Sequence, residues 1–209
     1  MKNIIFDMVP ENALDLNSPD TDGVEVFDLR ILCAIAKTKK NILEIGTRFG
    51  RTTCNLARFS PPDAKIISVD IDQSQVLRRA IDFYNRISPG KISLFECDSK
   101  HFCFDLFGPY DFVFIDGDHS SDGVICDTRN ALANLATGGV IVWHDFTSLP
   151  ILAGLRTLDL CQAQLGAYMG YTKGVRATLP DGSTNVQLQT VADFINEHLK
   201  KQGGTHGDH

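Results

Sequence analysis

Acidic and histidine side chains recur in this sequence at the points where strand-like, apolar segments end. In an open parallel sheet, ligands bind beyond the carboxyl ends of the strands. Carboxylates that share one crevice repel each other, so they persist together more readily when they bind a cation or the hydroxyl groups of a ligand. We therefore expect a cationic or hydroxyl-rich ligand rather than a phosphate. The candidate residues, in chain order, are Glu44 to Gly50, Asp70, Asp72, Asp98, Asp116 to His119, His144 and Asp145.

The elements that must position these residues alternate between strand-like and helix-like patterns. Such alternation is typical of a mostly parallel sheet with helices on both faces. The sequence predicts an α/β fold: a Rossmann-like, doubly wound, mostly parallel seven-stranded sheet with a C-terminal antiparallel hairpin around Lys173-Gly174. The predicted strands are 41–46, 65–71, 91–97, 110–117, 140–145, 166–172 and 174–180, and the predicted helices are 24–39, 51–59, 73–87, 99–106, 122–136, 150–164 and 191–201.

Size and composition limit the classes of protein that fit. A length of 209 residues fits one domain, so we expect a lead at 1–23, a single domain at 24–202 and a disordered tail at 203–209. The net charge of −6 and the scattered basic residues argue against nucleic-acid binding. Six cysteines without C-x-x-C spacing favour reduced thiols in a cytoplasmic protein, and the lack of a long apolar run argues against a membrane protein.

The stretch ILEIGTRFG, residues 42–50, connects a predicted strand to a predicted helix through two glycines. A dinucleotide site needs G-x-G-x-x-G, so that backbone amides can approach a pyrophosphate, and here only Gly46 and Gly50 are present. The glycines still let a ligand approach the turn closely, while Glu44 places negative charge near it. Asp70 at the end of the next strand strengthens the prediction of a ligand site. Any single acid could instead be a loop residue or a helix N-cap, and Asp72 is the clearest example.

From about residue 24 to residue 146, the sequence resembles class I S-adenosylmethionine-dependent methyltransferases. ILEIGTRFG is similar to the first motif of that family, whose acid-x-Gly-x-x-x-Gly turn lies against the methionine and ribose parts of the cofactor. The resemblance implies S-adenosyl-L-methionine as the cofactor of a single methyltransferase domain. The contacts it implies are Glu44, Gly46, Thr47 and Gly50, with Asp70 at the ribose hydroxyls and Asp98 near the adenine amino group. Asp116 is a further candidate for a contact with the cofactor.

Two later stretches, YDFVFIDGDHSSDGV and TGGVIVWHDF, are similar to the small-molecule O-methyltransferase branch, which includes catechol-type and sugar-modifying enzymes. In that branch, the acids that end strands four and five bind a divalent cation. The resemblance therefore implies a metal pair, Asp116 and Asp145, whose oxygens suit Mg²⁺. Catechol-type enzymes carry Asn at the next position, where this chain has Phe146, which cannot ligate. The metal requirement stays open, with Asp118 or His119 as alternatives for the third ligand.

Methylation of a hydroxyl requires its proton to leave, and a neutral imidazole near an acid is a suitable acceptor. The predicted catalytic residues are His119, Asp145 and His144, with His119 favoured because its loop faces the substrate side. Each histidine could also be structural, and a bound cation could lower the pKa of the hydroxyl instead.

The sequence thus predicts a methyltransferase that acts on a hydroxyl oxygen of a small molecule, with or without Mg²⁺. The alternatives are an NAD-dependent oxidoreductase, a metal-dependent phosphoesterase suggested by the D-G-D-H of residues 116–119, and a binding module without turnover. The short N-terminal lead offers little cover for the site, so a homodimer in which the partner closes it is also left open.

Overall fold

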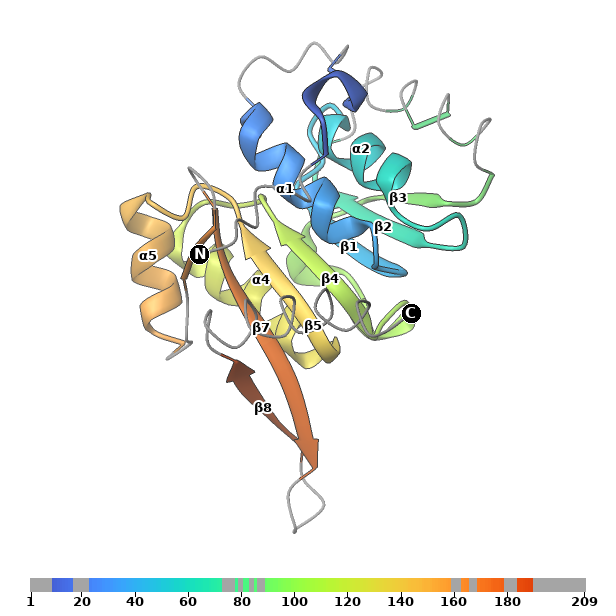
Figure 1. The fold of residues 1–209 in the computed structure, drawn as a ribbon. Helices are drawn as coiled ribbons and strands as arrows, with labels where there is room; N and C mark the ends of the chain where they lie inside the picture. The colour runs from blue at the N-terminus through green and yellow to red at the C-terminus, as the bar shows by residue number, and fades with distance from the viewer. Residues whose placement is uncertain are drawn as a thin grey trace, which may run out of the picture.

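The computed structural model describes residues 9–16, 23–72, 78, 81, 82, 85, 89–158, 163–165, 169–178 and 184–189. Its centre is an eight-stranded sheet with the order β3-β2-β1-β4-β5-β7-β6, in which β8 pairs with β7 (Figure 1). Strands β1 to β5 are parallel, and β7 is antiparallel to its neighbours. The strands are β1 Asn41–Ile45, β2 Lys65–Asp70, β3 Ile92–Glu96, β4 Tyr110–Ile115, β5 Leu135–Trp143, β6 Ala163–Leu165, β7 Met169–Thr178 and β8 Thr184–Gln189.

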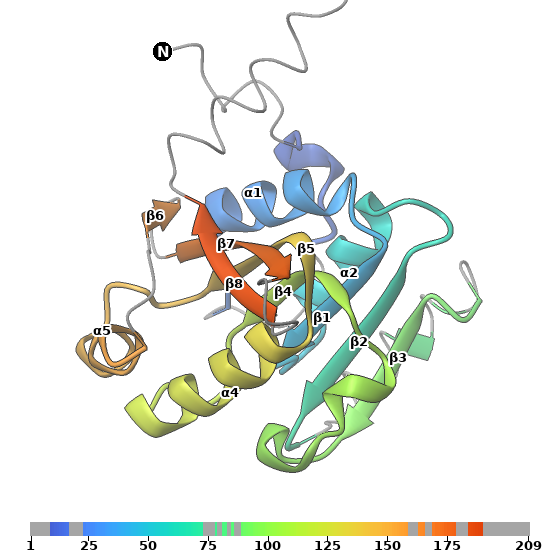
Figure 2. The ribbon, with the colours of Figure 1, turned by 90° about the horizontal axis from the view of Figure 1, so that it is seen from below.

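Helices cover both faces of the sheet (Figure 2). The α-helices are α1 Val26–Ala36, α2 Arg51–Phe59, α4 Ser121–Ala133 and α5 Leu149–Arg156, and the 3₁₀ turns are η2 Glu11–Ala13, η3 Ser99–His101 and η4 Phe104–Leu106. Because successive strand residues point to opposite faces, Ile42 packs in the core layer under α1 and α2, while Leu43 packs in the layer under α4 and α5. The central strands are therefore buried on both sides, which explains their nearly continuous apolar sequences.

The predicted fold class is confirmed, but the sheet has eight strands in the described residues instead of seven. The extra strand is β6, three residues long, which occupies the end of the helix predicted at 150–164. The chain is helical there only over α5, which ends at Arg156.

The position of the predicted hairpin turn is wrong. Lys173 and Gly174 do not form a turn but continue the ten-residue strand β7, and they pair with Gln189 and Leu188 of β8. Lys173 also pairs with Val140 of β5, so strands on both sides hold the backbone extended. This pairing outweighs the local turn signal of the glycine. The antiparallel hairpin itself exists between β7 and β8.

The Gly138-Gly139 pair, whose composition is typical of a turn, lies inside β5. Tyr110 of β4 pairs with Leu135, and Phe112 pairs with Val140, so residues 136–139 form an irregularity in the pairing. Gly138 has a φ of +74°, a left-handed conformation that glycine adopts without strain.

Other predicted elements have mixed outcomes. Two 3₁₀ turns, η3 and η4, replace the helix predicted at 99–106. Residues 78, 81, 82 and 85 are helical as predicted, while the rest of 73–87 lies outside the described residues, as do the predicted helix 191–201 and the tail 203–209.

The described part of the predicted N-terminal lead belongs to the packed core. Val9 is fully buried and its carbonyl accepts a hydrogen bond from Arg30, while the backbone of Asp15 exchanges hydrogen bonds with the side chain of Asn55. Residues 9–16 therefore connect α1 to α2 through these hydrogen bonds. The division into a lead, one domain and a tail stays a prediction.

Candidate functional site

A pocket of about 500 Å³ opens at the carboxyl ends of the parallel strands. It lies at the switch point of the sheet, where β2 and β3 extend from one side of β1 and β4 and β5 extend from the other. The structure brings most of the predicted site residues together here, because parallel strands end at one edge. Its lining includes Gly46, Thr47, Asp70, Asp98, Asp116, Asp118, His119, His144 and Asp145.

The loop after β1 passes very close to the end of β4. Gly46 has a φ of +89°, and a Cβ atom there would overlap the backbone carbonyl of Asp116. The amide of Gly46 donates to the carbonyl of Val69 at 2.9 Å, which ties the loop to β2. Only glycine combines this positive φ with such a close approach to the Asp116 carbonyl, so the backbone itself forms the pocket wall here.

Asp70 fixes this loop through backbone hydrogen bonds. Its Oδ2 accepts from the amides of Thr47 and Arg48 at 2.6 and 2.7 Å, and its Oδ1 accepts from the amide of Asp72 at 2.9 Å. Asp70 also lines the pocket, so one carboxylate both shapes the wall and faces the ligand space.

Glu44 and Gly50 are predicted cofactor contacts that the structure places outside the pocket lining. Glu44 is fully buried beneath the loop, where Oε2 accepts hydrogen bonds from the hydroxyls of Thr53 and Ser68 and Oε1 has no partner among the described residues. Burial raises the pKa of Glu44 to about 7, and Asp116 and Asp70 add to the increase. Gly50 has a φ of +80° and starts α2.

The end of β3 adds Asp98 and Ser99 to the pocket wall. Asp98 caps η3, because its Oδ1 accepts from the amide of Lys100 at 2.9 Å. Ser99 is half-buried, and its hydroxyl donates to Asp127 of α4 at 2.7 Å. The sequence analysis included Asp98 among the site residues, but it missed Ser99 and Asp127.

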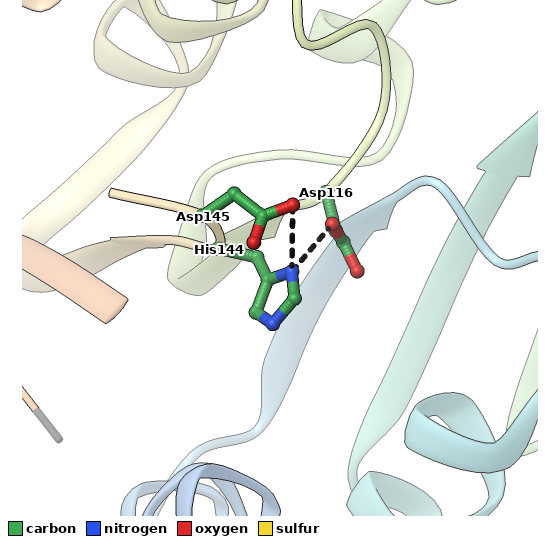
Figure 3. Close-up of side chains that lie close together, drawn as sticks. All are labelled: Asp116, His144 and Asp145. Carbon is green, nitrogen blue, oxygen red and sulfur yellow. Dashed lines mark hydrogen bonds and ion pairs between the residues drawn. The ribbon is translucent and has the colours of Figure 1, made fainter. Parts of the chain in front are cut away.

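At the other end of the pocket, two acids and two histidines form one cluster. Oδ1 of Asp116 lies 3.1 Å from both His119 Nε2 and His144 Nδ1. Oδ2 of Asp145 lies 3.3 Å from His119 Nδ1 and 3.6 Å from His144 Nδ1. Figure 3 shows Nδ1 of His144 facing both carboxylates. The four predicted residues thus occupy one site.

The charges in this cluster support each other. Burial alone would raise the pKa of Asp116, but hydrogen bonds from His119 and His144 hold it below its usual value. The hydrogen bond to Asp116 raises the pKa of His119, with Asp145 contributing. Burial alone would lower the pKa of His144, yet Asp116 and Asp145 raise it. Asp116 is therefore anionic near neutral pH, and the two carboxylates strengthen both imidazoles as bases.

An unusual backbone conformation brings His144 and Asp145 to the same site. Neighbouring strand residues normally point to opposite faces. Asp145 has a φ of +46°, a left-handed conformation that aspartate tolerates better than most residues, so the chain turns directly after β5. The sequence signal for this turn is the aspartate that follows the buried strand.

Asp116, His144 and Asp145 each offer one ligand atom, and these atoms lie within 4.8 Å of one another. Two carboxylate oxygens and one imidazole nitrogen suit a divalent cation. Of the predicted third ligands, Asp118 instead holds the amide of Ser120 at 2.9 Å and lies 3.5 Å from Lys100. His144, which we predicted as catalytic, completes the group.

Phe146 occupies the position of the missing asparagine. Its ring packs so closely against Gly170 that a Cβ at Gly170 would overlap it.

Part of the chain is similar to a known protein family. Residues 43–146 match a family model described as a methyltransferase domain. No curated protein sequence matches the chain significantly. Within the part of the chain that the structure describes, no helix is long and apolar enough to cross a membrane.

Solved structures share the fold at low sequence identity. The cofactor-bound protein Rv0187 of MTB is 19% identical, with a TM-score of 0.59, over 74% of this chain and 82% of that chain. The O-methyltransferase TomG of Streptomyces achromogenes, solved with SAM, is 17% identical, with a TM-score of 0.56, over 78% of each chain. An O-methyltransferase of Bacillus cereus, solved with SAH, is 20% identical, with a TM-score of 0.56, over 82% of this chain and 83% of that chain.

Proposed function

Residues 43–146 form a methyltransferase domain, as the resemblance in the sequence predicted, and we propose that the protein transfers a methyl group from S-adenosyl-L-methionine to a hydroxyl oxygen of a small molecule. The observation that carries this proposal is the cluster of Asp116, His119, His144 and Asp145, which shares one pocket with the glycine loop. The cluster offers proton acceptors, and the glycine loop offers a wall for a nucleoside. The O-methyltransferases TomG and the Bacillus cereus enzyme have the same fold.

The chain's own residues would act mainly by binding and orientation. Asp70 lines the pocket, and its Oδ1 accepts only one of the described backbone hydrogen bonds, which leaves capacity for a ribose hydroxyl. Thr47 and Gly46 shape the wall beside it. The reactive methyl group belongs to the cofactor, whose sulfonium supplies the driving force for transfer. Holding the two reactants in line can contribute about 7–11 kcal/mol to the lowering of the barrier.

His119 is the best-placed acceptor for the proton of the hydroxyl. Its side chain is 46% exposed at the pocket. The carboxylates of Asp116 and Asp145 raise its pKa, because they stabilise the imidazolium that forms when the ring accepts this proton. A neutral imidazole with a raised pKa is a stronger base. His144 is only 10% exposed, so it suits a role in holding Asp116 and Asp145.

A divalent cation, Mg²⁺ included, fits the donor set of Asp116, His144 and Asp145. The cation would supply a positive charge that lowers the pKa of a substrate hydroxyl. Since one donor is a nitrogen, Mn²⁺ and other transition metals also suit the set. We further propose a cytoplasmic location, supported by the free state of all five described cysteines. A homodimer stays a prediction.

The test is transfer of tritiated methyl from the cofactor to a panel of catechols, phenols and sugars, with and without EDTA. Asp145→Asn should lower turnover by about 10²–10⁴-fold, because it weakens the acid cluster. The matched control is Asp122→Asn, which removes an exposed carboxylate in the first turn of α4 outside the pocket. Absence of both methyl transfer and calorimetric binding of S-adenosylhomocysteine in the wild type would refute the proposal.

A further inference from the structure

A buried acid stands behind the wall at the β3 end of the pocket. Asp127 of α4 is 1% exposed, and its Oδ1 accepts the hydroxyl of Ser99 at 2.7 Å. Its Oδ2 has no hydrogen-bond partner among the described residues. A buried carboxylate with so few partners costs stability, which favours a role beyond packing.

Asp127 lies directly behind residues that face the ligand space. Ser99 and Gly117 both line the pocket, and a Cβ on Gly117 would lie 3.4 Å from Asp127 Oδ2. Asp127 itself is not part of the lining. Its hydrogen bond to Ser99 connects it to a polar group of the pocket wall.

The charge of Asp127 determines which way the Ser99 hydroxyl points. Burial raises the pKa of Asp127 to about 6, and the hydrogen bond from Ser99 opposes the increase. Asp118 and Asp98 raise this pKa, and Lys100 lowers it. Above pH 7 the carboxylate is mostly ionised and can only accept hydrogen bonds. The single proton of Ser99 is then committed to Asp127, and its lone pairs are left for the pocket.

The order of the strands assigns this wall to the purine base. This step rests on the proposed function. The sulfur of the cofactor must lie near the histidine cluster at the ends of β4 and β5, and the ribose lies near Asp70 at the end of β2. The base, which is joined to the far side of the ribose, then reaches the end of β3, where Asp98 and Ser99 lie.

We propose that Asp127 is a positioning residue that fixes the Ser99 hydroxyl as a hydrogen-bond acceptor, so that this wall selects a 6-aminopurine over a 6-oxopurine. A 6-amino group donates to an acceptor, whereas a 6-oxo group would face the Ser99 oxygen without a proton between them. Asp98 adds a second acceptor beside it.

The experiment compares the calorimetric affinities of S-adenosylhomocysteine and S-inosylhomocysteine, which differ at the 6-position and N1, at pH 7.5. The wild type should prefer the adenosyl compound by at least tenfold. In Asp127→Asn, the amide can donate to Ser99 and turn its proton toward the pocket, so the preference should narrow at least fivefold. Ser99→Ala removes the acceptor and should weaken binding of the adenosyl compound more than that of the inosyl compound.

Asp122→Asn, an exposed acid on the same helix, is the matched control and should keep the wild-type preference. A purely structural role for Asp127 predicts equal weakening of both compounds, so an unchanged affinity ratio in folded Asp127→Asn overturns the inference. An unchanged ratio in Ser99→Ala overturns it as well. If Asp127→Asn does not fold, the wild-type affinity ratio decides, since it should narrow as pH falls from 7.5 to 5 and Asp127 becomes protonated; an unchanged ratio then overturns the inference. If the wild type binds neither compound, the proposed function fails as well, and this outcome is distinct from binding without selectivity.

Discussion

The two ends of the pocket use their acids differently. At the β1 and β2 end, Glu44 and Asp70 are engaged by hydroxyls and backbone amides of the chain itself. At the β4 and β5 end, the described partners of Asp116 and Asp145 side chains are histidines. The first arrangement stabilises a loop conformation, while the second keeps titratable groups close together at the surface of a pocket.

This difference separates binding from chemistry within one crevice. A loop held by Asp70 needs no rearrangement to receive a ligand, which lowers the entropic cost of binding. The histidine cluster holds anions and strong bases at one point, the arrangement expected where protons or cations are handled. The predictions that follow test whether the two ends are in fact separable, beginning with the largest expected effect.

The separation predicts that Asp116→Asn abolishes most turnover and spares cofactor binding. Asp116 is the shared acceptor of His119 and His144, so the substitution loosens both imidazoles and removes a negative charge. Turnover should fall about 10²–10⁴-fold, while the dissociation constant of S-adenosylhomocysteine should change less than about tenfold, a difference of roughly 1.4 kcal/mol. Methyl transfer and calorimetry measure the two quantities. A parallel loss of affinity would instead make Asp116 a cofactor contact, the alternative that the sequence left open.

A second prediction concerns stability at the β1 end and its dependence on pH. The pKa of Glu44 rises from 4.5 to about 7 because of burial. Between these values the folded state binds more protons than the unfolded state, so the contribution of Glu44 to stability falls as pH rises through this window and stays low above it. Relative to Glu44→Gln, the wild type should therefore lose about 3 kcal/mol between pH 4.5 and 7.5.

Urea denaturation of both proteins at several pH values measures this difference. Since the Glu44→Gln variant carries no ionisable group at this position, all other titrations cancel in the comparison. Parallel stability curves for the two proteins would mean that folding does not shift the pKa of Glu44. The contrast between a buried structural acid and an open reactive cluster would then weaken.

The sequence predicted which residues lie at the carboxyl ends of the strands better than it predicted which of their side chains are buried. Asp70 is the last residue of β2, and Asp98, Asp116 and Asp145 follow the ends of β3, β4 and β5. The carboxyl ends of parallel strands meet wherever the fold is doubly wound. Glu44 precedes the end of β1 by one residue. Because side chains alternate between the two faces of a strand, the side chain of Glu44 lies on the same face as that of Ile42, under α1 and α2. Position relative to a strand end therefore separates pocket residues from buried supports.

Non-local contacts account for what the sequence could not predict. The Lys173-Gly174 pair has turn-like composition, yet pairing with β5 and β8 makes it part of a strand. Ser99 and Asp127 are 28 residues apart, and their hydrogen bond follows from the packing of α4 against η3. Neither contact has a signature in local periodicity.

The smallest predicted effect is a combined loss of stability and affinity in Asp70→Asn. The amide can accept on one side only, so at least one of the backbone amides of Thr47, Arg48 and Asp72 loses its acceptor. We expect a loss of about 2 kcal/mol in the free energy of unfolding and at least a tenfold weaker dissociation constant for S-adenosylhomocysteine. Asp72→Asn is the control, because Asp72 is exposed and lies outside the pocket lining. A loss of stability with unchanged affinity would restrict Asp70 to support of the loop, whereas a loss of affinity alone would make it a ribose contact that the loop does not need.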